Sequence, residues 1–271
     1  MLRRVFLLGM LVVLSFGWAS GSLAWDDSAG RLVLEKAIDG LPKQIKKFYE
    51  QREAVIFDLI TDPIRMGQRL TFEIDRLDEF PFDDIPEDWE LALRRFGEET
   101  IQEAGDLPWR LIETHEKLVE AFKQVDVESI ENLSAEIAYM VGELHNPVNV
   151  SKYGDGEPID QAGMRERFDE RLLEVYGEKL KFDTATAIFL DRPSEYVFNI
   201  PRRAYIWVDN ILLHDYIARM GVQSYDRFYY ESLWLRANVI LSQLLQSLSR
   251  DISSYWYTAW VMAGKPELPK E

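Results

Sequence analysis

Apolar residues recur along most of this chain with the period of an α-helix. One wide apolar stripe covers residues 111–122, and polar side chains fill the positions between. Because side chains three and four positions apart share a helix face, this stripe predicts an amphipathic helix with one side in a core. Asp106 is the expected N-cap of that helix, and Pro108 suits its first turn.

A second apolar stripe runs from Leu133 to Leu144 and ends before Asn146-Pro147. A proline disfavours helical backbone in the residue that precedes it, so the second helix is expected to end there. Further helices are expected between residues 204 and 260, with a break near Gly221 and an end around Ser253-Ser254.

Long alternating patterns of apolar and polar residues, which would indicate β-strands, do not occur in the sequence. Phe72-Glu73-Ile74 and Ala187-Ile188-Phe189 are candidates for short extended segments only. Proline and glycine cluster between residues 146 and 163, which indicates loops inside one domain. The sequence therefore predicts an all-α fold, a compact single-domain helical bundle over residues 25–271.

The first 24 residues have the organisation of an export signal. Arg3-Arg4 is followed by the apolar run Val5–Trp18, which is shorter than a membrane-spanning helix. The small residues of Gly21-Ser22-Leu23-Ala24 predict cleavage after Ala24, which leaves Trp25 at the N-terminus of a periplasmic or secreted protein. An uncleaved anchor is the alternative, and the arginine pair leaves the general and twin-arginine export routes open. After Trp25, no apolar run is long enough to span a membrane.

The charge balance is strongly acidic, with a formal net charge of −16, and there are no cysteines. An exported domain without disulfides depends on its core for stability. No block of lysines and arginines is basic enough to form a duplex-binding stripe, so duplex nucleic acid is not an expected partner.

Aromatic residues and the three histidines carry no clear catalytic pattern. His115, His145 and His214 are expected to have structural roles, since none has a convincing nucleophile or acid at the spacing of a catalytic triad. One aromatic cluster near the C-terminus follows helical spacing in part and is expected to belong to the core. Its members are Tyr225, Phe228, Tyr229, Tyr230 and Trp234.

Five fragments spread along the chain match the motifs of one known family. They are Trp25 after the cleavage site, Leu70-Thr71-Phe72-Glu73-Ile74-Asp75, Tyr139–Asn149, Gly163–Asp169, and Tyr255–Trp260. Together they resemble the superfamily of zinc-dependent phospholipases C and single-strand-specific nucleases. The resemblance implies a helical bundle whose core binds three zinc ions and hydrolyses phosphodiester bonds.

The resemblance also marks the positions that would hold metal. It implies that the N-terminal amine and carbonyl of Trp25 and the acids Asp75, Glu143 and Asp169 occupy positions of zinc ligands. Trp25 as a plain core aromatic is the alternative. Oxygen ligands alone would favour calcium, magnesium or manganese over zinc.

Five histidines that the family uses as zinc ligands are replaced in this chain. Neutral imidazole binds zinc tightly without adding negative charge, and the replacements are poor ligands. They are Gly30, Leu70, Tyr139, Asn149 and Arg165. We therefore expect no cofactor, with zinc or another divalent cation bound only if the residual site is occupied.

Arg165 suggests how such a site could work without metal. Arg165 and Asp169 are four residues apart, the spacing of an ion pair on an α-helix. If Glu143 and Asp169 approach each other, their repulsion requires a cation, and a fixed guanidinium could supply it. The hypothesis is a metal-free site neutralised by Arg165.

Three functions stay open. The leading hypothesis is an exported, non-catalytic relative of these hydrolases that acts in binding or structure, with a periplasmic protein or a phosphodiester as ligand. The first alternative is a phosphodiester hydrolase with a reduced, carboxylate-rich metal site. The second is an accessory scaffold at the membrane surface, although net acidity disfavours binding to anionic lipid.

Overall fold

The computed structural model describes residues 25–62 and 70–269, and within these ranges every regular element is a helix. The all-α prediction is therefore confirmed, whereas the export signal and its cleavage after Ala24 lie outside the described residues. The elements are α1 (Asp27–Asp39), α2 (Lys43–Glu50), α3 (Glu53–Thr61), η1 (Ile74–Arg76), α5 (Trp89–Phe96), α6 (Glu98–Ala104), α7 (Leu107–Gln124), α8 (Val127–His145), η2 (Pro147–Asn149), η3 (Glu157–Ile159), η4 (Glu166–Arg171), α9 (Leu172–Tyr176), η5 (Gly177–Lys179), α10 (Pro193–Tyr205), α11 (Val208–Arg219) and α12 (Arg227–Met262).

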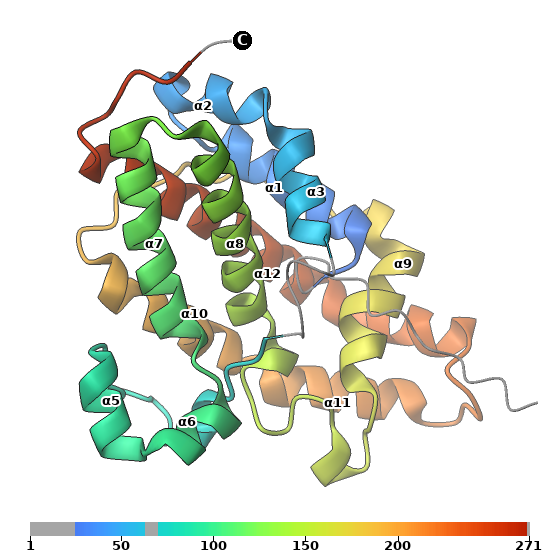
Figure 1. Ribbon diagram of the computed structural model, residues 1–271. Helices are drawn as coiled ribbons and strands as arrows, with labels where there is room; N and C mark the ends of the chain where they lie inside the picture. Colours follow the sequence, from blue (N-terminus) through green and yellow to red (C-terminus); the bar gives the residue numbers. More distant parts are fainter. Residues whose placement is uncertain (1–24, 63–69, 270–271) are drawn as a thin grey trace, which may run out of the picture.

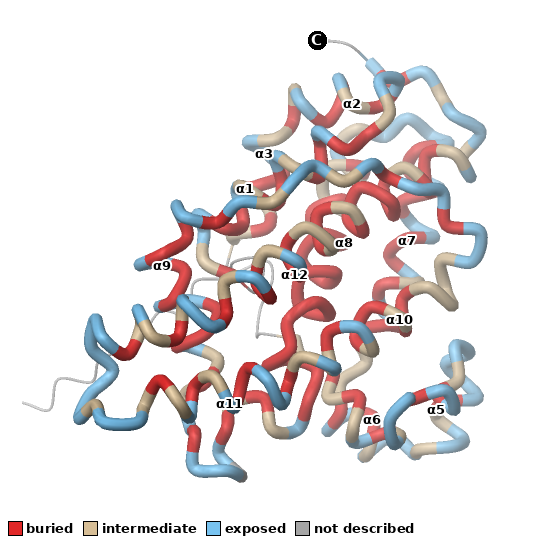
Figure 2. Tube along the Cα trace, turned by 180° about the vertical axis from the view of Figure 1, so that it is seen from behind, coloured by how far each residue is buried: buried red, intermediate tan, exposed pale blue. Residues whose placement is uncertain are grey.

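The long helix α12 is the centre of the bundle. It packs against α1, α7, α8, α9 and α11, so it contacts elements from the start, the middle and the end of the chain (Figure 1). In Figure 2 the second half of α8 and the last turns of α12 are almost entirely buried, whereas the outer helices carry many exposed residues. The core is therefore built around these two helices.

The ends of α7 and α8 follow from local chemistry. Asp106 is the N-cap of α7 and Pro108 stands in its first turn, as predicted. Asp126 caps α8 by accepting a hydrogen bond from the Ser129 amide at 3.2 Å. The helix ends at His145, since Pro147 follows closely and cannot continue it.

The predicted end of α12 is wrong. The helix passes Ser253 and Ser254 and continues to Met262. Both hydroxyls donate to the carbonyl oxygen of Arg250 inside the helix, at 2.8 and 2.7 Å. Because the serine side chains bond to their own helix, they do not need to terminate it.

Residues 70–73 have no regular secondary structure and lie beside the chain that follows α8, and Ile74, which was expected in a short extended segment, begins η1. The Phe72 amide donates to the Asn149 carbonyl at 2.9 Å, and the Ile74 amide donates to the Val150 carbonyl at 3.2 Å. These two bonds do not make a strand, but they fix residues 72–75 against the end of α8.

None of the described helices combines the length and the apolar character that a membrane crossing requires.

Candidate functional site

The four positions marked by the resemblance gather around one short segment, residues 146–152, which follows α8. Asp75, Glu143 and Asp169 each accept a hydrogen bond from this segment, and Trp25 packs on Phe168, the neighbour of Asp169. We call these four residues, with Asn146 and Asn149, the carboxylate site. Residues separated by more than a hundred positions in the sequence thus meet at the C-terminal end of α8.

Glu143 lies on the last turn of α8, and it is buried. The side-chain amide of Asn149 donates to Glu143 Oε2 at 2.6 Å, and both side chains are essentially inaccessible to water. Pro147 and η2 turn the chain back after the helix, which brings Asn149 to this carboxylate. A short bond between an amide donor and a carboxylate is the kind that stabilises a buried negative charge.

Asp169 receives a similar bond from the same segment. The side-chain amide of Asn146 donates to Asp169 Oδ2 at 2.9 Å, and Asp169 is also fully buried. The backbone carbonyl of Asp169 accepts from the amide of Asp26, the neighbour of Trp25, at 2.9 Å. Trp25 itself is buried against Phe168, with 6.0 Å between the ring centroids.

Asp75 is the most accessible member of the carboxylate site. It accepts hydrogen bonds of 2.8 Å from the Ser151 hydroxyl and from the Lys152 amide, and one of 3.3 Å from the Tyr205 hydroxyl. Burial, followed by the nearby Asp75 charge, raises the pKa of Tyr205 to about 12. The phenol of Tyr205 therefore stays protonated and acts as a donor to Asp75.

The predicted ion pair between Arg165 and Asp169 is wrong. The Arg165 guanidinium lies 3.6 Å from Glu73 and donates to the Val148 carbonyl at 3.1 Å. The reason is the backbone of η4, which has π-helical rather than α-helical hydrogen bonding. A π-turn contains more residues than an α-turn, so positions i and i+4 no longer lie one above the other.

The donor set of the carboxylate site does not fit zinc. Amide hydrogens of Asn146 and Asn149 point at Asp169 and Glu143, where a metal ion would have to approach. Over residues 25–62 and 70–269, no group of three or more His, Cys, Asp and Glu side chains is placed to hold a metal ion. The side chains of the carboxylate site are therefore arranged to bond to one another.

A second buried polar cluster, missed from the sequence, lies around Asp251 of α12. His145 Nε2 lies 3.2 Å from Asp251 Oδ2, while His145 Nδ1 lies 2.9 Å from the Val141 carbonyl and must donate to it. Arg203 and Arg250 also pair with Asp251, at 2.5 and 3.2 Å. His145 is thus a structural histidine, as expected.

A third cluster surrounds Asp215, which the sequence had offered only as the neighbour of His214. Asp215 pairs with Arg167 at 3.0 Å and accepts hydrogen bonds from Tyr229 and from Gln161. The Arg167 side chain also donates to the Ala162 and Gln161 carbonyls, and its guanidinium lies 4.3 Å from the ring of Tyr225. Arg167 thus connects η4 to α11 through Asp215 and to α12 through Tyr229.

His115 is buried beside Tyr255, with 5.4 Å between the ring centroids. Burial lowers the pKa of His115 to about 4, against the opposing effect of a hydrogen bond to the Tyr255 backbone. The imidazole of His115 is therefore neutral at neutral pH, which fits the structural role expected from its place beside an apolar stripe.

No family model and no curated protein matches this chain. The resemblance to the zinc-dependent phospholipases C and nucleases consequently rests on the motifs in the sequence.

Proposed function

We propose that this protein is an exported, non-catalytic relative of the zinc-dependent phospholipases C and nucleases, and that it acts by binding rather than by hydrolysis. The observation that carries the proposal is the pair of amide–carboxylate bonds, Asn149 to Glu143 and Asn146 to Asp169. Each replaces, at a position that the resemblance marks as a metal ligand, a metal–oxygen bond with a bond inside the protein.

Physical chemistry supports this substitution. A carboxylate in a low-dielectric site requires a cation or several hydrogen bonds, because an uncompensated buried charge is costly. Asn149 stands where the resemblance expects an imidazole that binds metal through a nitrogen lone pair, whereas the side-chain amide of Asn149 directs an N–H donor at Glu143. The site keeps its acids, but their partners are now side chains of the same chain.

Metal content and turnover test the proposal. The full chain, exported from its host and purified without chelators, is assayed for metals by elemental analysis and for hydrolysis of bis(p-nitrophenyl) phosphate and phosphatidylcholine. Glu143→Gln serves as the matched variant, since it removes the charge and keeps the shape of the side chain. We expect less than one metal ion per chain, and no hydrolysis that differs between the two proteins.

One result would support the alternative of a phosphodiester hydrolase with a carboxylate-rich metal site made from Asp75, Glu143, Asp169 and Trp25. In that result, the native chain contains one or more metal ions per molecule and hydrolyses the substrates, and Glu143→Gln has neither the metal nor the activity. Detection of the chain in the cytosol, with its first 24 residues intact, would contradict the export part of the proposal.

A further inference from the structure

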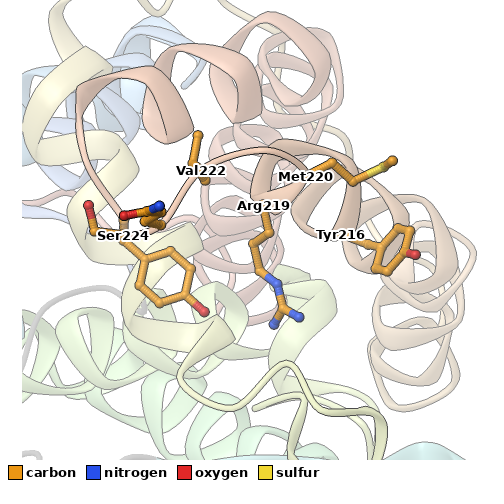
Figure 3. A pocket seen from close by; sticks show the side chains of 7 residues that line it. Tyr216, Arg219, Met220, Val222 and Ser224 are labelled. Atoms are coloured by element: carbon orange, nitrogen blue, oxygen red, sulfur yellow. The ribbon is translucent and has the colours of Figure 1, made fainter.

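The turn between α11 and α12 forms an open pocket of about 390 Å³. This volume lies within the range of pockets that bind small molecules. One short stretch of chain makes the pocket, since α11 ends at Arg219 and α12 begins at Arg227. We call it the turn pocket. Its lining residues are Tyr216, Arg219, Met220, Val222, Gln223, Ser224 and Tyr225 (Figure 3).

The lining of the turn pocket differs in charge from the rest of the molecule. Among the described residues it contains one arginine and no aspartate or glutamate, although the chain as a whole has a formal net charge of −16. Three other pockets in the described part of the chain are each lined by at least two acids. These acids are Glu116 and Asp191 in one, Glu98 and Asp106 in another, and Glu87, Asp88, Asp106, Glu113 and Glu116 in the third. An anion therefore meets less repulsion in the turn pocket than in those three.

Arg219 supplies the positive charge of the turn pocket, and a backbone carbonyl rather than a carboxylate holds its guanidinium. Nη1 of Arg219 donates to the Asp160 carbonyl at 2.7 Å. Within residues 25–62 and 70–269, no acid forms an ion pair with Arg219. In Figure 3 the Arg219 side chain extends between Tyr216 and Ser224. Because a guanidinium carries five N–H donors, those that Asp160 does not use can bind the oxygens of an anion.

The acid nearest to the turn pocket in the sequence, Asp226, has its carboxylate engaged at the start of α12. Asp226 Oδ1 accepts hydrogen bonds from the amides of Phe228 and Tyr229, at 2.9 and 3.2 Å. Such bonds hold an N-cap carboxylate against the first turn of its helix, where the helix dipole also offsets the charge. Asp226 therefore does not neutralise Arg219.

Tyr225 forms a fixed aromatic wall of the turn pocket. It was expected in the core with its cluster, but Tyr225 is 46% exposed and Phe228 is 71% exposed, whereas Tyr229 is fully buried. The ring of Tyr225 stands edge-on to that of Tyr229, with 4.8 Å between the centroids, and the Arg167 guanidinium lies 4.3 Å from its centroid. Because these contacts hold the ring in place, a ligand binds it with a smaller loss of conformational entropy.

We propose that the turn pocket binds a small organic anion, a carboxylate or a phosphate carried on an aromatic ring. Arg219 binds the anionic oxygens, and Gln223 and Ser224 supply further donors. The ring of the ligand packs against Tyr216 and Tyr225. The turn pocket shares no residue with the carboxylate site, so this proposal does not depend on the proposed function.

Cationic and neutral ligands fit the turn pocket less well. Arg219 repels a cation, and the described lining offers no carboxylate to bind one. A neutral apolar ligand displaces water from Arg219 without giving the guanidinium a new partner, which costs free energy. The ligand that satisfies both the arginine and the two tyrosine rings is an aromatic anion.

Isothermal titration calorimetry with defined anions tests the proposal. The full chain, exported from its host, is titrated with phenylphosphonate and with benzoate, neither of which has an ester bond to cleave. Benzyl alcohol and benzylamine are the neutral and cationic probes of similar size, and methylphosphonate is the anion without a ring. The test variant is Arg219→Gln. The matched control is Arg236→Gln, which removes an exposed arginine of α12 that bonds to Ser232 of its own helix.

We expect phenylphosphonate or benzoate to bind at least about tenfold more tightly than benzyl alcohol, and methylphosphonate to bind more weakly than phenylphosphonate. Arg219→Gln should raise the Kd of the anion at least about tenfold, because hydrogen bonds to a charged group are lost. Arg236→Gln should bind as the native chain does. Tighter binding of phenylphosphonate would identify a phosphate as the preferred anion, and tighter binding of benzoate a carboxylate.

Circular dichroism establishes that both variants keep the helical content of the native chain. A native chain that binds neither aromatic anion would overturn the proposal, and so would equal binding of benzyl alcohol or benzylamine. Affinity that Arg219→Gln retains would place the anion elsewhere on the molecule. An equal loss in the two arginine variants would contradict the proposal as well, because net charge rather than the turn pocket would then be responsible.

Discussion

Asn149 donates a 2.6 Å hydrogen bond to Glu143, and neither side chain is accessible to water. The two residues are six positions apart, and the turn through Pro147 brings them together. In the family that the sequence resembles, both positions would face a metal ion. Here they face each other, so their interaction should be measurable as protein stability.

Substitution of Asn149 by leucine removes the amide donor from a buried carboxylate. We expect Asn149→Leu to lower the free energy of unfolding by about 2–3 kcal/mol, because a buried charged acceptor loses a partner. Urea unfolding followed by circular dichroism measures the change. The control is Asn210→Leu on the exposed side of α11, which should change stability by no more than about 0.5 kcal/mol. Equal effects in the two variants would mean that the Asn149–Glu143 bond contributes nothing.

Asp251 should make the stability of the protein sensitive to acid. Burial raises the pKa of this carboxyl, but the contact with His145 and the charges of Arg203 and Arg250 outweigh burial and lower it from 3.8 to about 2. A depressed pKa in the folded chain stabilises the fold above the unfolded pKa, and the stabilisation is lost as the pH falls from about 4 towards 2. The expected contribution is roughly 2 kcal/mol.

The comparison of the native chain with Asp251→Asn isolates this contribution. The difference in unfolding free energy should be largest above pH ~4 and should shrink towards pH ~2. Glu231→Gln, an exposed acid on the same helix, should follow the native chain throughout. A difference between the native chain and Asp251→Asn that stays constant with pH would show that the Asp251 ion pairs do not titrate as expected.

His115 should act in a different pH range. Burial lowers its pKa from 6.5 to about 4. Between these two pH values His115 is protonated in the unfolded chain and neutral in the folded chain. Protonation then favours unfolding, and the native chain should lose about 3 kcal/mol of stability through this residue as the pH falls from 6.5 to 4. In His115→Gln this loss should disappear, as measured by urea unfolding at pH 8 and pH 5. Parallel pH slopes in the two proteins would contradict the prediction.

The helices that were predicted well have strong local signals. The end of α8 before Pro147 needs only the steric rule for the residue before a proline, and the start of α7 needs only Asp106 and Pro108. The end of α12 was placed too early because Ser253-Ser254 looks like a helix stop. No sequence rule shows that their hydroxyls bond to Arg250 within the helix.

The carboxylate site was predicted as a set of positions but not as a set of bonds. The resemblance placed Glu143 and Asp169 in one region, and the structure brings both to residues 146–149. The Arg165 ion pair failed because spacing was interpreted with α-helical geometry, and η4 is a π-turn. The Arg167–Asp215 pair was missed because its members are 48 positions apart and share no local pattern.

The π-turn η4 also has a mechanical consequence. Within three consecutive residues it sends Arg167 into the polar cluster of α11 and α12, packs Phe168 on Trp25, and turns Asp169 towards the end of α8. Three separate parts of the bundle thus contact one short stretch of backbone. This stretch contains no glycine, so its backbone has little freedom to change conformation when one of these parts moves. A shift of the α11–α12 pair, such as contact with another surface would cause, should be transmitted through η4 to the carboxylates at the far side of the turn.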